Sequence, residues 1–201
     1  PREAPRSKTA PKDAVPLINA AMQALDPEGE WFPLGTIGQT IQSTHPDFDS
    51  RSFGCSKLSE LIEKAGRYET RRLCAWFDDK FHKEVTANLL YERVNKKMMK
   101  AGYPESKNIK AGAQKIKFHL DYMSWLLDHR RWLAGNSMTL ADFAAAAHLS
   151  SLDYISDVDW NRSQNVRDWY AKIKSRPAFR SILADVVPGF PPPAHYADLD
   201  F

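Results

Sequence analysis

The stretch Ser137-Met138-Thr139-Leu140-Ala141-Asp142-Phe143 carries the strongest helix-start signal in this chain. Thr139 is a preferred N-cap residue. Asp142, three positions later, can accept a hydrogen bond from the amide of Thr139, so that the two residues satisfy each other's free backbone groups. Met138 before the cap can pack on Phe143 after the first turn. We therefore predict a helix with a structural N-cap here, and the pattern says nothing about catalysis.

Two long helices are predicted before this start. Apolar residues recur at spacings of three and four over 71–100, and again from Ser106 or Asn108 to His129. The break between them, Gly102-Tyr103-Pro104, is short, so the two helices must lie antiparallel.

The sequence after this start also predicts helix, and then a tail. An alanine run at 144–147 is typical of a central helix that its neighbours approach closely. Shorter helices are predicted around Trp169 and from Pro177, a residue tolerated in a first helical turn. Four prolines from Pro188 onward forbid further helix. The fold class is therefore mainly α, with an all-helical bundle at 71–187 and an extended tail at 188–201.

The part of the chain before Arg71 has a different organisation. Residues 1–12 hold three prolines and no large apolar side chain, which predicts a flexible linker. Three short amphipathic helices follow, starting at Asp13 and covering 34–43 and 52–64. The strand-like run Arg67-Tyr68-Glu69-Thr70 comes next. Three helices and a strand predict a small winged helix-turn-helix over 13–70.

Composition limits the function classes. The net charge is only +3 in 201 residues, which does not indicate a strongly basic nucleic-acid protein. Cys55 and Cys74 lack metal-ligand spacing, and the six histidines form no ligand pattern, so we expect a reduced, cytoplasmic protein without a bound metal. No apolar run approaches the roughly 20 residues that span a bilayer, so no membrane insertion is expected.

A basic run begins at the end of the first long helix and continues into the second. It consists of Lys96, Lys97, Lys100, Lys107, Lys110, Lys115 and Lys117. Such a run can offer a positive surface to an acidic partner or to nucleic acid. It is also what a solvated helix end looks like, because lysines near a helix C-terminus suit the helix dipole.

The segment WFPLGTIGQTIQSTHPDFDSRSFGCSKLSELIEKAGRYE (31–69) resembles the LOTUS domain, also called the OST-type helix-turn-helix. The matching motifs are LG-x-IG at 34–38, HPDFD-x-R at 45–51 and FGCSKLSELIE at 53–63. The resemblance implies a module that binds RNA, with G-rich RNA among the candidates, or that binds a protein.

Basic and aromatic residues around the third helix are the candidates for that contact. They are Arg51, Lys57, Lys64, Arg67 and Tyr68. Basic side chains could meet phosphates and the tyrosine could stack on a base. Residues 1–70 carry 8 basic and 10 acidic residues, so charge alone leaves RNA and protein both open. The resemblance favours RNA.

Residues 71–201 resemble the C-terminal helical domain of glutathione transferase-fold proteins. The matching runs are RWLAG at 131–135, SMTLADF at 137–143 and DWYAKIKSRPAF at 168–179, with Trp160 between them. In that family the glutathione site lies in an N-terminal thioredoxin-like domain, and nothing in residues 1–70 resembles it. The resemblance therefore implies neither a catalytic residue nor a cofactor site in this chain.

Two further runs, SLDYISDVDW at 151–160 and HYADLDF at 195–201, resemble an alphaproteobacterial branch of the transferase fold that works in cell division. That branch implies lost glutathione chemistry and a tail that helps to bind FtsZ or other division proteins. The implied docking residues are His195, Tyr196, Asp198, Leu199, Asp200 and Phe201. Without the resemblance, the tail would be interpreted as a frayed terminus.

We therefore expect a non-catalytic adaptor in which a LOTUS-like module precedes a transferase-type helical module. The alternative is a fragment of a glutathione transferase that lacks its glutathione-binding domain. A homodimer is left open, because the transferase-fold dimer normally also uses the domain that is missing from residues 1–70.

Overall fold

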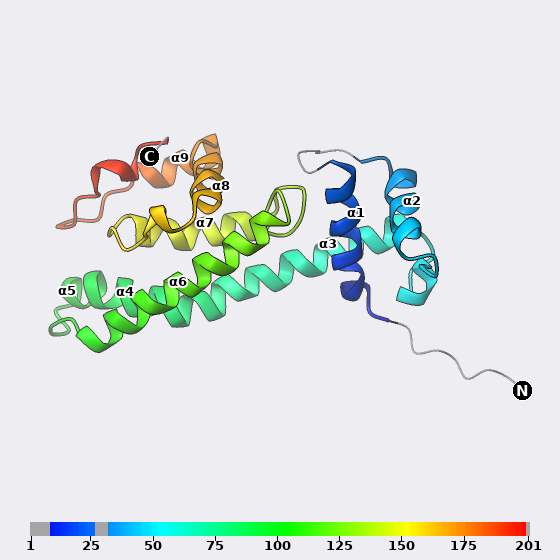
Figure 1. Cartoon of the computed structure of the whole chain (residues 1–201). Coiled ribbons are helices and arrows are strands. Elements are labelled where there is room, and N and C mark those ends of the chain that lie inside the picture. Colours follow the sequence, from blue (N-terminus) through cyan, green and yellow to red (C-terminus); the bar gives the residue numbers. More distant parts are fainter. Residues whose placement is uncertain (1–8, 27–31, 200–201) are drawn as a thin grey trace, which may run out of the picture.

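The computed structural model describes residues 9–26 and 32–199, and within these ranges it contains helices but no β-strand. Figure 1 shows an elongated molecule with a group of short helices at one end and a larger helical bundle at the other. A single helical rod runs from the first group into the second. This architecture confirms the mainly α fold class.

The short helices pack on the first half of α3 (Leu58–Ala75). They are η1 (Pro11–Ala14), α1 (Val15–Leu25), α2 (Leu34–Thr44) and η2 (Ser50–Phe53). Their apolar positions form a separate small core of Ala14, Ile18, Ala21, Ile37, Ile41, Cys55, Leu61 and Ala65. Helices were predicted in these two stretches, from Asp13 and over 34–43, and both are confirmed.

The linker predicted over residues 1–12 does not extend as far as Lys12. Residues 1–8 lie outside the described residues, but Pro11 and Lys12 belong to the 3-10 helix η1. The amide of Thr9 donates to the carbonyl of Ser52 over 2.9 Å. Ordered structure therefore begins before Asp13, because the backbone of this segment pairs with the turn that precedes α3.

The predicted wing is wrong. Residues 67–70, expected as a strand, lie in the middle of α3. Glu69 is only 5% exposed there, and its carboxylate pairs with Arg72 and with Arg130, which comes from the loop after α6. A strand would turn Glu69 away from Arg130, so the tertiary ion pairs hold this segment in helix. The third helix also starts later than predicted, at Leu58, after a left-handed turn at Gly54 with a φ of 72°.

The helix predicted over 71–100 is present, with wide π-type turns that its periodicity did not indicate. α3 passes directly into η3 (Trp76–Thr86), α4 (Ala87–Leu90), η4 (Tyr91–Asn95) and α5 (Lys96–Met98). The backbone stays right-handed helical at every junction, so these segments form the rod seen in Figure 1. π-turns of this kind insert residues without breaking a helix.

The second long helix, α6 (Ser106–Asp128), returns along this rod as predicted. The two approach closely at Gly112, where a Cβ atom would lie 2.8 Å from Leu89 Cγ. The bundle is completed by α7 (Leu140–Asp153), η5 (Trp160–Arg162), α8 (Gln164–Lys174), α9 (Pro177–Leu183) and η6 (Ala194–Tyr196). The rod, α6, α7 and α8 enclose the main core, in which Phe77, Phe81 and Met123 are completely buried.

The helix start at 137–143 is confirmed. Thr139 Oγ1 accepts from the amide of Ala141 (3.2 Å), and Asp142 Oδ2 accepts from the amide of Thr139 (2.8 Å). Asp142 Oδ1 accepts two more hydrogen bonds, from the amide of Leu133 (3.0 Å) and from Trp169 Nε1 (2.9 Å). This fully buried carboxylate therefore joins the loop before α7, α7 itself and α8.

Candidate partner-binding sites

One side of α3 carries most of the predicted RNA-contact residues. Lys57 is its N-cap, and Lys64, Arg67 and Tyr68 follow at helical spacing, so they share an exposed face with Arg71. Tyr68 is 43% exposed, and Lys12 Nζ lies 5.8 Å from the centre of its ring. The fifth predicted residue, Arg51, lies in η2 and not on this helix. We call Lys57, Lys64, Arg67, Tyr68 and Arg71 the α3 face.

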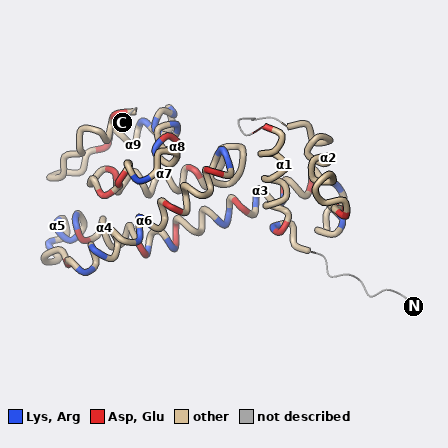
Figure 2. Tube along the Cα trace, viewed as in Figure 1, with Lys and Arg blue, Asp and Glu red and all other residues tan. Residues whose placement is uncertain are grey.

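Acidic residues neutralise part of this face. Lys64 Nζ lies 2.8 Å from Glu60 Oε1 and Arg67 Nη2 lies 2.5 Å from Glu63 Oε1. The hydrogen bond from Lys64 lowers the pKa of Glu60 to about 2. Four basic residues against these two carboxylates leave a charge of +2. Figure 2 shows basic and acidic residues alternating along this part of the chain. The face is thus mildly basic, with one aromatic ring at its centre.

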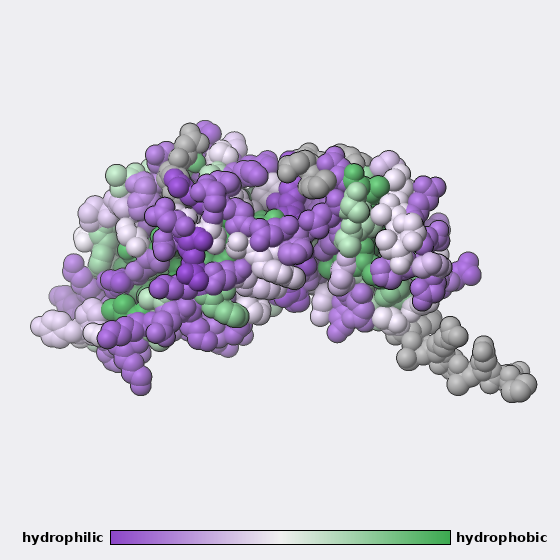
Figure 3. All heavy atoms as spheres, in the orientation of Figure 1, coloured by the Kyte–Doolittle hydropathy of each residue, from purple (hydrophilic) through white to green (hydrophobic). Residues whose placement is uncertain are grey.

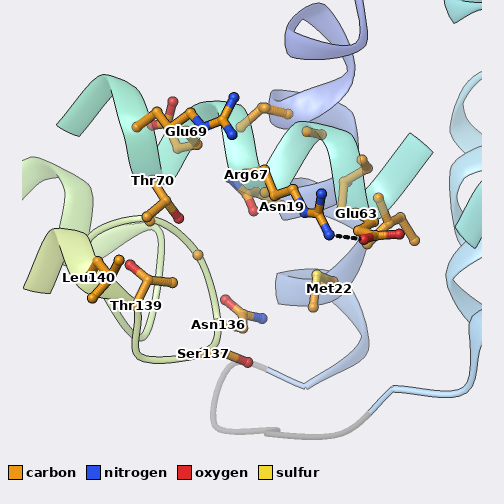
Figure 4. A pocket seen from close by; sticks show the side chains of 18 residues that line it. Asn19, Met22, Glu63, Arg67, Glu69, Thr70, Asn136, Ser137, Thr139 and Leu140 are labelled. Atoms are coloured by element: carbon orange, nitrogen blue, oxygen red, sulfur yellow. Dashed lines mark hydrogen bonds and ion pairs between the residues drawn. The ribbon is translucent and has the colours of Figure 1, made fainter. Parts of the chain in front are cut away.

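A cavity of about 570 Å³ lies between the small helical domain and the bundle, and no local sequence pattern indicated it. Its walls come from α1, from α3 and from the loop at 134–140, which lies more than 100 residues after α1. Figure 4 shows Asn19 and Met22 on one side of this space and Asn136 and Thr139 on the other. Figure 3 shows the apolar side of α1 as a green strip.

The C-terminal segment is packed into the bundle, which was not expected. Tyr196 is 3% exposed, and its hydroxyl lies 2.9 Å from Ser150 Oγ. Leu199 packs partly buried against the main core, and Asp198 is exposed. Of the predicted docking residues, Tyr196 therefore packs against α7 and does not present its ring at the surface. The predicted docking residues Asp200 and Phe201 lie outside the described residues.

A buried polar cluster holds this segment in place. His195 Nε2 lies 3.0 Å from Asp153 Oδ1, which also accepts from Trp160 Nε1 over 2.8 Å. Lys174 Nζ donates to the carbonyl oxygen of His195 over 3.3 Å and lies 4.0 Å from Asp153 Oδ2. Burial raises the pKa of Asp153 and lowers the pKa of Lys174. Sequence reasoning missed both residues, because an isolated Asp or Lys at a helix end gives no sign of burial.

The two cysteines do not resemble nucleophiles. Cys55 is buried and Cys74 is partly buried, and burial, with help from Asp78, raises the pKa of the Cys74 thiol. A catalytic cysteine needs the opposite shift, toward the thiolate. Across residues 9–26 and 32–199, no three His, Cys, Asp or Glu side chains are grouped so that they could hold a metal ion. In the same ranges no helix is long and apolar enough to cross a bilayer.

The chain matches two family descriptions and several known proteins. Residues 5–72 match the OST-HTH/LOTUS domain, and residues 79–185 match the glutathione S-transferase C-terminal domain. FtsZ-localized protein A of Caulobacter vibrioides is 51% identical over 139 residues, which are 69% of this chain and 61% of that protein. This chain therefore spans less than two thirds of that relative.

Solved structures give the same relationship. The structure of FzlA from C. crescentus is 35% identical, with a TM-score of 0.67 and coverage of 96% of this chain and 97% of that chain. A glutathione S-transferase from Rhodospirillum rubrum is 39% identical, with a TM-score of 0.66 and coverage of 90% and 83%. The chain has an OST-HTH/LOTUS domain in its first part and, through residues 79–185, belongs to the glutathione S-transferase C-terminal domain family.

Proposed function

We propose that this chain is a non-catalytic binding protein that docks onto FtsZ with its helical bundle and C-terminal segment. The observation that carries the proposal is the 51% identity to a protein named for its localisation with FtsZ. The shared 139 residues are about as long as the bundle together with the C-terminal segment. A cytoplasmic location goes with this proposal, because FtsZ would be the partner.

The anchored C-terminal segment supports a docking role. His195 and Tyr196 fix the segment on the bundle, and the acidic and apolar residues Asp198 and Leu199 follow directly. A short segment held at its base loses less conformational entropy on binding than a free tail does. Alternating carboxylates and apolar side chains fit a groove with a basic rim.

Co-sedimentation with assembled FtsZ tests this proposal. We expect the wild-type chain to pellet with FtsZ filaments, and Asp198→Lys or Leu199→Ala to weaken the binding at least tenfold. Asp168→Lys is the matched control, because Asp168 is an exposed carboxylate on α8 whose hydrogen-bond partner is its helix neighbour Gln164. Unchanged binding of both tail variants would remove the docking role from the segment.

Absence of catalysis is a separate part of the proposal. Residues 5–72 match a helix-turn-helix type of domain where a transferase would place its glutathione-binding domain. We expect no conjugation of glutathione to a chlorinated nitroarene by this chain. A measurable rate would instead favour the fragment of a glutathione transferase as the correct interpretation.

RNA binding by the first domain is a second candidate function, favoured by the α3 face. Its four basic residues flank Tyr68. Proteins that bind single-stranded RNA use basic side chains to contact the phosphates and aromatic rings to stack on the bases. In a filter-binding assay with G-rich RNA, Lys57→Glu should lower the affinity about tenfold, while Lys117→Glu on α6 should not. Equal affinities for the two variants would favour protein as the ligand of this domain.

A homodimer is proposed through α6. Phe118, Tyr122 and Trp125 lie on one side of this helix, and Phe118 and Trp125 are 54% and 53% exposed. The rings of Tyr122 and Trp125 stack with centroids 6.3 Å apart. Light scattering should give twice the 22.9 kDa of one chain, and Trp125→Ala should return the mass to one chain. A wild-type mass of one chain would exclude the dimer.

A further inference from the structure

The turn between α5 and α6 exposes an unusual group of apolar side chains. Met98 is 55% exposed, Met99 is 68% exposed and Tyr103 is 92% exposed, which is the highest value among the large hydrophobic residues that are exposed. Figure 1 places this turn at the end of the molecule far from the N-terminal helices. Left-handed backbone at Lys100 and Gly102 shapes the turn that carries them. These side chains cover nothing in the core, so packing does not explain them.

Lysines surround this apolar group. Residues 96–110 contain five lysines and one acid, Glu105, for a net charge of +4. Lys96 is buried and paired with Glu92 and Glu105, whereas Lys97, Lys100, Lys107 and Lys110 are exposed. Lys97 also lies over the ring of Phe190 at 4.6 Å. Figure 2 shows blue segments gathered around α5.

We propose that this basic-apolar tip, made of Met98, Met99, Tyr103 and the four exposed lysines, binds to the surface of an anionic lipid bilayer. The lysines would meet the lipid phosphates while the methionines and the tyrosine enter the headgroup region. Tyrosine suits that region because its ring is apolar and its hydroxyl stays hydrated. The contact is peripheral, and it needs no helix that spans the bilayer.

Shape and charge favour a bilayer over a folded protein. The turn that joins α5 to α6 lies at the end of the molecule, and it carries Met99 and Tyr103 directly after Met98, the last residue of α5. A folded partner would need a matching pocket, whereas lipid headgroups adapt to a tip of any shape. Lysine is a compact point charge that needs no fixed geometry, which suits headgroups without fixed positions. Each lysine near an anionic surface contributes about 1 kcal/mol, equivalent to about fivefold in affinity.

Sedimentation with vesicles tests the tip. The full chain should pellet with vesicles of phosphatidylcholine and phosphatidylglycerol, should not pellet with phosphatidylcholine alone, and should be released by high salt. Lys100→Glu with Lys107→Glu should weaken the binding by about twentyfold or more, because each lysine contributes about fivefold. Met99→Ser with Tyr103→Ser should weaken it about tenfold.

The matched controls make the same kinds of substitution at exposed positions outside the tip. Lys117→Glu on α6 and Leu140→Ser on α7, at a side chain 72% exposed, should both bind like wild type. The proposal is overturned if the chain does not bind anionic vesicles, or if the tip variants bind as well as these controls. It is also overturned if the tip variants keep vesicle binding and lose FtsZ binding, which would make the tip a protein contact. The vesicle assay contains no FtsZ, so its failure leaves the proposed function standing.

Discussion

His195 and Asp153 lie 42 residues apart in the sequence, and the structure places His195 Nε2 3.0 Å from Asp153 Oδ1. Tyr196, the next residue, bonds to Ser150 one helical turn before Asp153 on α7. Two consecutive side chains thus attach the C-terminal segment to one helix. Asp198 and Leu199 follow directly from this fixed point, Asp198 exposed and Leu199 partly buried, which is the basis of the proposed docking role.

Tyr196 should contribute to stability in two separable ways. Tyr196→Phe removes the bond to Ser150 and should lower the free energy of unfolding by about 1 kcal/mol. Tyr196→Ala also removes a buried ring and should lower it by about 3 kcal/mol or more. Urea unfolding measures both values. A cost below about 1 kcal/mol for the alanine variant would mean that the segment is not packed in solution.

Asp142 should be essential for folding of the bundle. Asp142→Ala leaves Trp169 Nε1 and the amides of Leu133 and Thr139 without their acceptor, in a site with no exposed surface. We expect a loss of about 3 kcal/mol or more in the free energy of unfolding. Leu140→Ala, at a neighbouring position that is 72% exposed, is the control and should cost less than about 0.5 kcal/mol. Similar unfolding midpoints for the two variants would contradict this role.

Two histidines, His119 fully buried and His148 partly buried, should make stability depend on pH. Burial lowers the pKa of His119 and of His148, so each takes up a proton less readily in the folded chain than in the unfolded chain, where the ordinary pKa is about 6.5. The unfolded state therefore binds more protons in this window. Their contribution to stability is complete above about pH 6.5 and is lost as the pH falls below it.

His119→Gln isolates one of these contributions. A glutamine keeps a donor near Glu84, the residue that lies 3.1 Å from His119 Nε2, but it does not titrate. Thermal unfolding between about pH 7 and about pH 5 should show a smaller loss for this variant than for wild type. His129→Gln, at an exposed position, is the control for the substitution itself. An unchanged slope in His119→Gln would show that His119 does not titrate as inferred.

Local signals made part of the fold predictable. The capping partners Thr139 and Asp142 are three residues apart, so the sequence alone could pair them. The other ligands of Asp142 could not be predicted in this way. Trp169 is 27 residues away, and only the packing of α8 on α7 brings its indole to the carboxylate.

The prediction of a wing was also wrong because the deciding contact is distant in the sequence. Residues 67–70 have a strand-like composition, but Leu61, Ala65, Glu69 and Leu73 recur every four residues on the buried side of α3. The Arg130 partner of Glu69 is 61 residues away, so a local pattern could not distinguish a buried Glu on a helix from a solvated one on a strand. The same limit hid the burial of Tyr196.

Removal of the residues after Tyr196 tests the central claim most directly. A chain ending at Tyr196 keeps both bonds to α7 and loses only the partly buried Leu199 from the core, so it should still fold cooperatively, at a slightly lower urea concentration than the full chain. We predict that this truncated chain no longer pellets with FtsZ filaments, whereas the full chain does. Equal pelleting of the two folded chains would contradict the claim that the C-terminal segment docks onto FtsZ.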